Sequence, residues 1–173
     1  YCRATGEAVE ATVSDSMEDG RLTQSFSWGS EISQFVGSGQ LEAQEDAHWN
    51  WLSKIRDRSS RDGSMLRFVA VGNTLEGVML LEEWPNGARI FSQLGLPLLY
   101  VEYLATAPKN RVPGLHRFSG VGTALLVEAI LESSRAGFSG RIGLHSLPQA
   151  DEFYRRCGFT GLGGDPAVQN LHY

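Results

Sequence analysis

A glycine-containing turn between two apolar segments constrains this chain of 173 residues more than any other feature. The turn is Arg117-Phe-Ser-Gly-Val-Gly-Thr-Ala-Leu-Leu126, and it follows the apolar run Leu98-Leu-Tyr-Val-Glu-Tyr-Leu-Ala105. Glycines let a backbone approach an anion closely, and the N–H groups and dipole of a helix N-terminus bind negative charge. We therefore predict a strand, a turn and a helix that together hold a pyrophosphate or another anion.

The composition is that of one globular domain. Apolar residues make up 42% and charged residues 20% of the chain, and a chain of this length buries roughly 70% of the surface of its unfolded state. The net charge of −5 disfavours a nucleic-acid partner, because nucleic-acid modules usually carry a basic face. The same charge favours a cationic or amine-bearing substrate.

The sequence also indicates a cellular location. Cys2 and Cys157 form neither a metal-ligand motif nor a disulfide framework, as is typical of free cytosolic thiols. No apolar run approaches the ~20 residues of a membrane span, and the first residues lack the character of a signal peptide. We therefore expect a cytoplasmic protein without a membrane partner.

The spacing of apolar residues predicts an α+β (mixed α/β) fold. Strands are expected near 9–13, 66–71, 77–81, 98–106, 141–145, 159–162 and 168–173, and helices near 32–36, 42–57, 119–136 and 148–157. The segment 14–40 is rich in Ser, Gly, Asp and Glu. We therefore expect a single domain over residues 1–173, with residues 1–40 flexible or peripheral.

Three blocks of the chain resemble the GNAT superfamily of acyl-CoA-dependent N-acetyltransferases. They are the strand Tyr100–Thr106, the turn Arg117–Leu126 and the block Gln149–Phe159, which matches the family pattern Ala-x-x-x-Tyr-x-x-x-Gly-Phe. The resemblance is strong over about residues 66–163, and before residue 60 it rests on element order alone. It implies a central mixed, mostly antiparallel sheet of about six to seven strands flanked by about four helices, with acetyl-CoA as co-substrate and no metal.

The resemblance also implies which residues bind acetyl-CoA. Main-chain groups of the strand before the turn would pair with the pantetheine, where that strand splays away from the strand near 142–145. The turn and the start of its helix would hold the pyrophosphate. The implied cofactor-binding residues are Leu104, Ala105, Thr106, Arg117, Phe118, Ser119, Gly120, Val121, Gly122, Thr123, Phe153 and Tyr154.

Acetyl transfer to an amine needs a base for the ammonium and an acid for the departing thiolate. Tyr154 occupies the position where the family often has its acid; a tyrosine there could instead pack or hydrogen-bond the thioether sulfur. Glu102, which interrupts an apolar strand, is the first candidate base. A carboxylate there could alternatively bind a substrate cation or form a salt bridge on the far face of the sheet. His145 is the rival base, since histidine titrates near neutral pH.

The chain departs from the family pattern around two positions. Pro108–Gly114 also spells the family opening Pro-x-x-Arg-x-x-Gly, but no second glycine follows it, so we assign the cradle to Arg117 and treat 109–116 as an insertion. Lys109 and Arg111 of this insertion could meet phosphate or belong to an ordinary loop. Leu147 stands where the family often has Asn, whose contact is either missing or supplied by Ser146.

The preferred function is transfer of an acetyl group from acetyl-CoA to a primary amine. The first alternative is a protein or peptide N-acetyltransferase. The second is an acyl-CoA-binding regulatory module without turnover, which the absent Asn favours. A homodimer is also expected, because final strands of this fold often pair between subunits.

Overall fold

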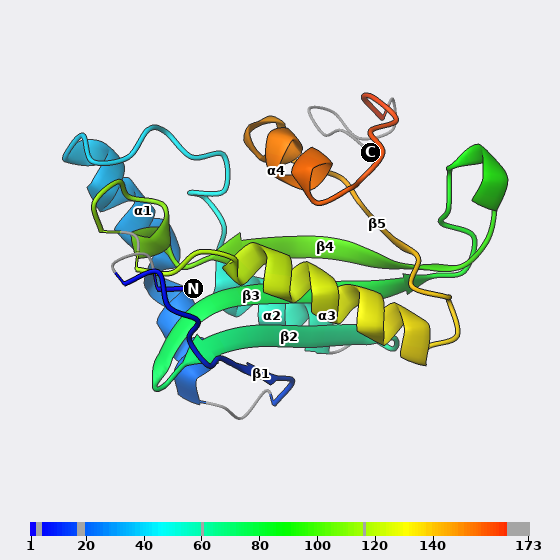
Figure 1. The fold of residues 1–173 in the computed structure, drawn as a ribbon, viewed down its shortest axis with the longest axis horizontal. Coiled ribbons are helices and arrows are strands. Elements are labelled where there is room, and N and C mark those ends of the chain that lie inside the picture. The colour runs from blue at the N-terminus through cyan, green and yellow to red at the C-terminus, as the bar shows by residue number, and fades with distance from the viewer. Residues whose placement is uncertain (3–4, 17–19, 60, 116, 166–173) are drawn as a thin grey trace.

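The computed structural model describes residues 1–2, 5–16, 20–59, 61–115 and 117–165. Within these ranges, five strands form one sheet in the order β1-β2-β3-β4-β5, and four α-helices accompany it (Figure 1). The strands are β1 (Thr12–Ser14), β2 (Ser64–Val71), β3 (Thr74–Trp84), β4 (Leu98–Thr106) and β5 (Ile142–Leu144). The α-helices are α1 (Trp28–Gly37), α2 (Trp51–Ser59), α3 (Val121–Arg135) and α4 (Asp151–Arg156). Shorter 3₁₀ segments are η1 (Gly20–Ser27), η2 (Phe91–Gln93), η3 (Pro108–Asn110) and η4 (Pro148–Ala150).

The predicted α+β class and mixed sheet are confirmed. Strands β1 to β4 are antiparallel neighbours, and β5 runs parallel to β4. In the described part of the chain none of the α-helices is long and apolar enough to cross a membrane.

The strand count is lower than predicted: the described residues form five strands rather than six to seven. The strand expected at 159–162 is irregular. Gly158 and Gly163, which bracket it, have φ of 92° and 89°, a backbone conformation that interrupts an extended strand. The strand expected at 168–173 lies outside the described residues, so the homodimer expected through it stays a prediction.

The helix predicted over 42–57 begins only at Trp51. Asn50 caps it, because Asn50 Oδ1 accepts a hydrogen bond from the Ser53 N–H at 3.0 Å and its carbonyl accepts one from the Lys54 N–H. Residues 41–50 form an irregular loop instead. This 41–50 loop later proves to be one wall of the candidate site.

The sheet buries a hydrophobic core on each face. In β3, Leu80 belongs to the core beneath η1 and α2, whereas Met79 and Leu81 belong to the core beneath α3. Figure 1 shows α3 across one face and α2 on the opposite face. Leu22 of η1 and Trp28 of α1 are buried in the first core, so the segment expected to be flexible or peripheral supplies part of it.

Helix α3 lies so close to β3 that Gly77 has no room for a side chain. A Cβ at Gly77 would lie 2.7 Å from Val121 Cγ1 and 2.9 Å from Leu125 Cδ1. We expect Gly77→Ala to lower the free energy of unfolding by about 1–3 kcal/mol, because overpacking forces the helix or strand to shift. Urea denaturation measures this. Gly37→Ala is the matched control, since no atom of the described residues lies within 4 Å of a Cβ there; equal losses in both variants would contradict the close packing.

Candidate active site

A cavity of about 870 Å³ lies between the second half of β4, the 41–50 loop and the segment η4–α4. This volume falls in the range of small-molecule sites. The cavity brings together all three predicted catalytic residues, Glu102, His145 and Tyr154. It also reaches Gly122 in the first turn of α3.

The cavity lies where β4 and β5 separate. The two strands pair only from Leu99 opposite Ile142 to Val101 opposite Leu144. Beyond Val101, the residues 102–106 of β4 line the cavity. The main chain of 104–106, predicted to pair with pantetheine, therefore runs along the cavity wall, where an extended ligand could add to the edge of the sheet.

Glu102 lies on a β-bulge. Leu80 pairs with Tyr103 and Leu81 pairs with Val101, so Glu102 is the extra residue opposite β3. A bulge bends its strand and redirects the side chains around it. The Glu102 side chain is half-buried and lines the cavity. This position places the Glu102 side chain on the cavity wall.

Tyr154 lines the opposite wall of the cavity from α4. Burial, with smaller contributions from Cys157, Asp46 and Tyr100, raises the pKa of Tyr154 well above its ordinary value. Its ring packs edge-to-face against Phe153 and Phe159, with centroids 5.0 and 5.6 Å away. The phenol is therefore held in place and stays protonated, as a hydrogen-bond donor must.

The turn predicted to form an anion cradle lies at the N-terminus of α3. Gly120 precedes the helix with φ of 83°, which favours glycine, and N–H groups in the first turn of a helix have no partner within the helix. A Cβ at Gly122 would lie 2.9 Å from Phe153 Cζ, so this glycine lets α4 pack against the helix start. The N–H groups of Gly120 to Thr123 are thus the candidate donors.

Two other predicted donors have partners inside the protein. The Phe118 N–H donates to Asn110 Oδ1 at 3.2 Å, and the Ser119 N–H donates to the Tyr1 carbonyl at 2.9 Å. Arg117 is exposed, and its guanidinium lies 5.2 Å from the centroid of the Phe118 ring.

A buried carboxylate missed by the sequence analysis organises the insertion before the cradle. Glu76 of β3 is fully buried, pairs with Lys109 Nζ at 3.0 Å and accepts a hydrogen bond from Asn110 Nδ2 at 2.7 Å. Asn110 in turn holds the Phe118 N–H. Glu76 is therefore linked through one side chain to the start of the cradle.

Arg111 likewise has an internal partner that the sequence did not indicate. It donates two hydrogen bonds of 2.7 Å to Asp46 and a third, of 3.1 Å, to the Thr106 carbonyl. This bidentate pair ties the 41–50 loop to the end of β4. Gln149 ties the same loop to η4, through bonds to the Ala43 carbonyl and the Glu45 N–H.

His145 is buried and makes contacts through both ring nitrogens. Nδ1 lies 2.8 Å from the Tyr100 hydroxyl, and Nε2 lies 2.9 Å from Asp165 Oδ2. Arg89 Nη1 lies 2.7 Å from the same Asp165 oxygen. Next to His145, the Ser146 hydroxyl donates to Asp151, while Leu147 lines the cavity.

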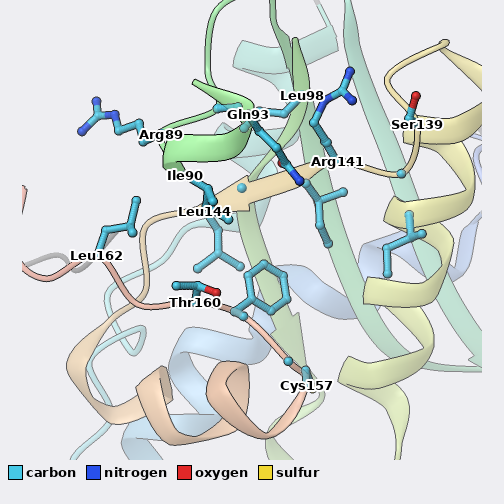
Figure 2. Close-up of a pocket in the computed structure, with 17 residues that line it drawn as sticks. Arg89, Ile90, Gln93, Leu98, Ser139, Arg141, Leu144, Cys157, Thr160 and Leu162 are labelled. Carbon is cyan, nitrogen blue, oxygen red and sulfur yellow. The ribbon is translucent and has the colours of Figure 1, made fainter. Parts of the chain in front are cut away.

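A second cavity, of about 310 Å³, lies beside β5 (Figure 2). Ile90, Leu98 and Leu144 give it an apolar lining, and the figure shows the Arg89 guanidinium pointing away from these side chains. Neither Glu102 nor Tyr154 lines this cavity. Among the described residues, no group of three or more His, Cys, Asp or Glu side chains is placed to hold a metal ion.

Solved structures share this fold, although no protein-family model and no curated protein sequence matches the chain. An aminoglycoside 6'-N-acetyltransferase from Acinetobacter baumannii superposes with a TM-score of 0.59 and 9% identity, over 92% of this chain and 97% of that one. A predicted acetyltransferase from Clostridium acetobutylicum, solved with acetyl-CoA, gives 0.54 and 12%, over 92% and 95%. A transcriptional regulator from Bacillus halodurans gives 0.56 and 16%, over 92% and 99%. The chain therefore has the fold of the GNAT acetyltransferases.

Proposed function

We propose that this protein is an N-acetyltransferase that moves an acetyl group from acetyl-CoA to a primary amine. The observation that carries the proposal is the 870 Å³ cavity, in which the bulged Glu102, the protonated Tyr154, the β4 edge and the start of α3 meet. Each of these parts suits one portion of the reaction.

The donor would lie along β4 and reach the start of α3. Main-chain groups of Leu104 and Ala105 pair with the pantetheine amides, while the N–H groups of Gly120 to Thr123 bind the pyrophosphate. Phe153, packed on Gly122, lines the passage between the two. This arrangement delivers the thioester to the wall that carries Glu102 and Tyr154.

The reaction needs one residue that accepts a proton and another that donates one. Glu102 accepts a proton from the acceptor ammonium, and the neutral amine attacks the thioester carbonyl carbon to form the C–N bond. The nitrogen then loses its second proton to a further acceptor. When the C–S bond breaks, the sulfur keeps the electron pair and takes a proton from Tyr154. A phenol whose pKa is raised by burial is protonated whenever the thiolate leaves.

The cavity wall carries carboxylates that favour a cationic amine. Glu45 and Glu102 line the cavity, whereas the Asp46 carboxylate is paired with Arg111. The Lys54 ammonium lies over the rings of Tyr103 and Trp49, at 3.4 and 4.8 Å from their centroids, and so occupies these aromatic faces. Because a similarly folded protein is an aminoglycoside N-acetyltransferase, small polycationic amines are the first acceptors to test.

Acetyl-CoA binding and CoA release test this function together. We expect calorimetry to detect acetyl-CoA binding, and a thiol assay to detect CoA release with aminoglycosides or polyamines but less with lysine peptides. Gly122→Val should abolish binding, because its side chain displaces Phe153, whereas Gly37→Ala should bind normally. Release with peptides alone would replace the small-amine assignment by peptide acetylation. Binding without release on any amine would identify an acyl-CoA-binding regulatory module instead.

A further inference from the structure

We propose that Tyr100, His145 and Asp165 form a proton relay for the acetyl transfer, in which Tyr100 meets the acceptor and the other two residues act through it. The inference rests on the proposed function and deepens it. Three distant segments create the relay: β4, the residue after β5, and the segment beyond α4. Asp165 and Arg89, which complete it, were not indicated by the sequence.

Hydrogen-bond chemistry gives the relay a direction. The Asp165 carboxylate only accepts, so His145 donates to it from Nε2–H at 2.9 Å. In the neutral imidazole Nδ1 is then an acceptor, and the Tyr100 hydroxyl donates to it at 2.8 Å. Arg89 balances the charge of Asp165 at 2.7 Å. A proton can therefore leave Tyr100 for His145, whose imidazolium would be stabilised by the Asp165 carboxylate.

The surroundings hold the relay in place. The side chains of His145 and Asp165 are each 4% exposed, which restricts proton exchange with bulk water except through the cavity. The Trp84 ring stacks on Tyr100 with centroids 3.9 Å apart and planes 8° from parallel. Such a stack fixes the ring orientation and therefore the direction of the hydroxyl.

Tyr100 also lines the cavity that contains the candidate catalytic residues. Glu102 and Tyr154 line the same cavity, and Tyr100 makes a small contribution to the raised pKa of Tyr154. Tyr100 is thus beside the groups assigned to the reaction, whereas His145 reaches the acceptor through it.

The relay supplies a proton acceptor that Glu102 and Tyr154 leave missing. An ammonium loses one proton before attack and a second from the tetrahedral intermediate. Glu102 takes the first. As the C–N bond is completed, the second passes from nitrogen to the Tyr100 oxygen while the Tyr100 proton moves to His145 Nδ1. Tyr154 protonates the sulfur. After the products leave, the His145 imidazolium and Glu102 each release a proton to solvent, and Tyr154 takes up a proton again.

Substitutions along the relay test its role during turnover. Tyr100→Phe keeps the stack on Trp84 and should lower kcat by roughly 10- to 100-fold with little change in KM for acetyl-CoA. Asp165→Asn should lower kcat as well, and the double variant should be no slower than the slower single one, because the two residues act as one unit. Added imidazole should restore part of kcat to His145→Gly, with His145→Gln as the variant that keeps the site filled. Unchanged kcat in Tyr100→Phe, or multiplicative losses, would overturn the relay.

Nitrogen NMR of the His145 ring separates this inference from the proposed function. We expect the native protein to carry the ring proton on Nε2, with an Nδ1 resonance that shifts in Tyr100→Phe. A ring protonated on Nδ1 would overturn the relay even if the protein acetylates amines. The expected tautomer together with no CoA release on any amine would refute the proposed function, and the relay's catalytic role with it.

Discussion

Tyr154→Phe is expected to lower kcat for acetyl transfer by about 10²- to 10³-fold, while KM for acetyl-CoA changes little. The variant removes only the hydroxyl and keeps the ring that packs against Phe153 and Phe159. Since the thiolate then has to take its proton from water, the loss falls on the step in which the C–S bond breaks. Steady-state kinetics with the best acceptor, with CoA release as the signal, measures both constants.

A control on the same helix separates chemistry from packing. Arg156 of α4 has an exposed side chain whose one ion pair among the described residues is with Glu152 of the same helix, so Arg156→Gln should leave kcat unchanged. Equal kcat for Tyr154→Phe and the native protein would show that Tyr154 only packs in the site. Loss confined to KM would assign it to donor binding.

The same hydroxyl has an effect on stability that needs no substrate. Burial raises the pKa of Tyr154 above that of an unfolded tyrosine, which ionises near pH ~10. The free energy of unfolding that this raised pKa contributes is fully present below pH ~10. It is lost as the pH rises further, because the tyrosine then loses its proton in the unfolded state but not in the folded state. The unfolding free energy of the native protein should therefore fall more steeply above pH ~10 than that of Tyr154→Phe. Parallel denaturation curves across this range would contradict the buried phenol.

Residues with a local signature were predictable from the sequence. Gly120 and Gly122 indicate a helix N-terminus that an anion or a neighbouring segment can approach closely. Glu102 is recognisable as a charged residue within an apolar strand. Tyr154 lies in a block with a recognisable pattern. The structure brings these residues to one cavity, because α3 packs on β4 and Phe153 of α4 packs against Gly122 of α3.

Partners that come from distant segments were not predictable. Asp46 lies 65 positions from Arg111 and Asp165 lies 20 from His145, and no local pattern couples either pair. The same interactions explain the wrong helix start: Ala47, Trp51 and Ile55 recur every four residues, but Asn50 caps the helix and the preceding loop bonds to Arg111 and Gln149 instead. Tertiary contacts override such a pattern.

The buried Glu76 of β3 has a recognisable signal in the sequence. Glu76 interrupts the run Leu75–Leu81 in the same way that Glu102 interrupts β4. A carboxylate with no exposed surface has to be paired, so a basic partner near the strand end was predictable in kind. The fold alone shows which residues pair with it, since Lys109 and Asn110 lie against the beginning of β3.

Glu76→Ala is expected to lower the free energy of unfolding by about 3 kcal/mol, and Glu76→Gln by about 1 kcal/mol. Alanine leaves Lys109 and Asn110 without their acceptor; the penalty stays below that of a fully buried pair because the Lys109 side chain is 33% exposed and can regain water. Glutamine keeps an acceptor for Asn110 and loses only the ion pair. Urea denaturation at neutral pH measures both, with Glu83→Ala, at an exposed position of the same strand, as the control.

The double variant Glu76→Leu with Lys109→Met shows whether the ion pair stabilises the fold or positions Asn110 at the cradle. Replacing a buried ion pair by apolar side chains is often neutral for stability, so this variant should recover most of the free energy that Glu76→Ala loses. Acetyl-CoA binding should nevertheless be weaker than in the native protein, because Asn110 loses the carboxylate that orients it toward the Phe118 N–H at the start of the cradle. Recovered stability with native affinity, measured by calorimetry, would show that the cradle does not depend on Glu76.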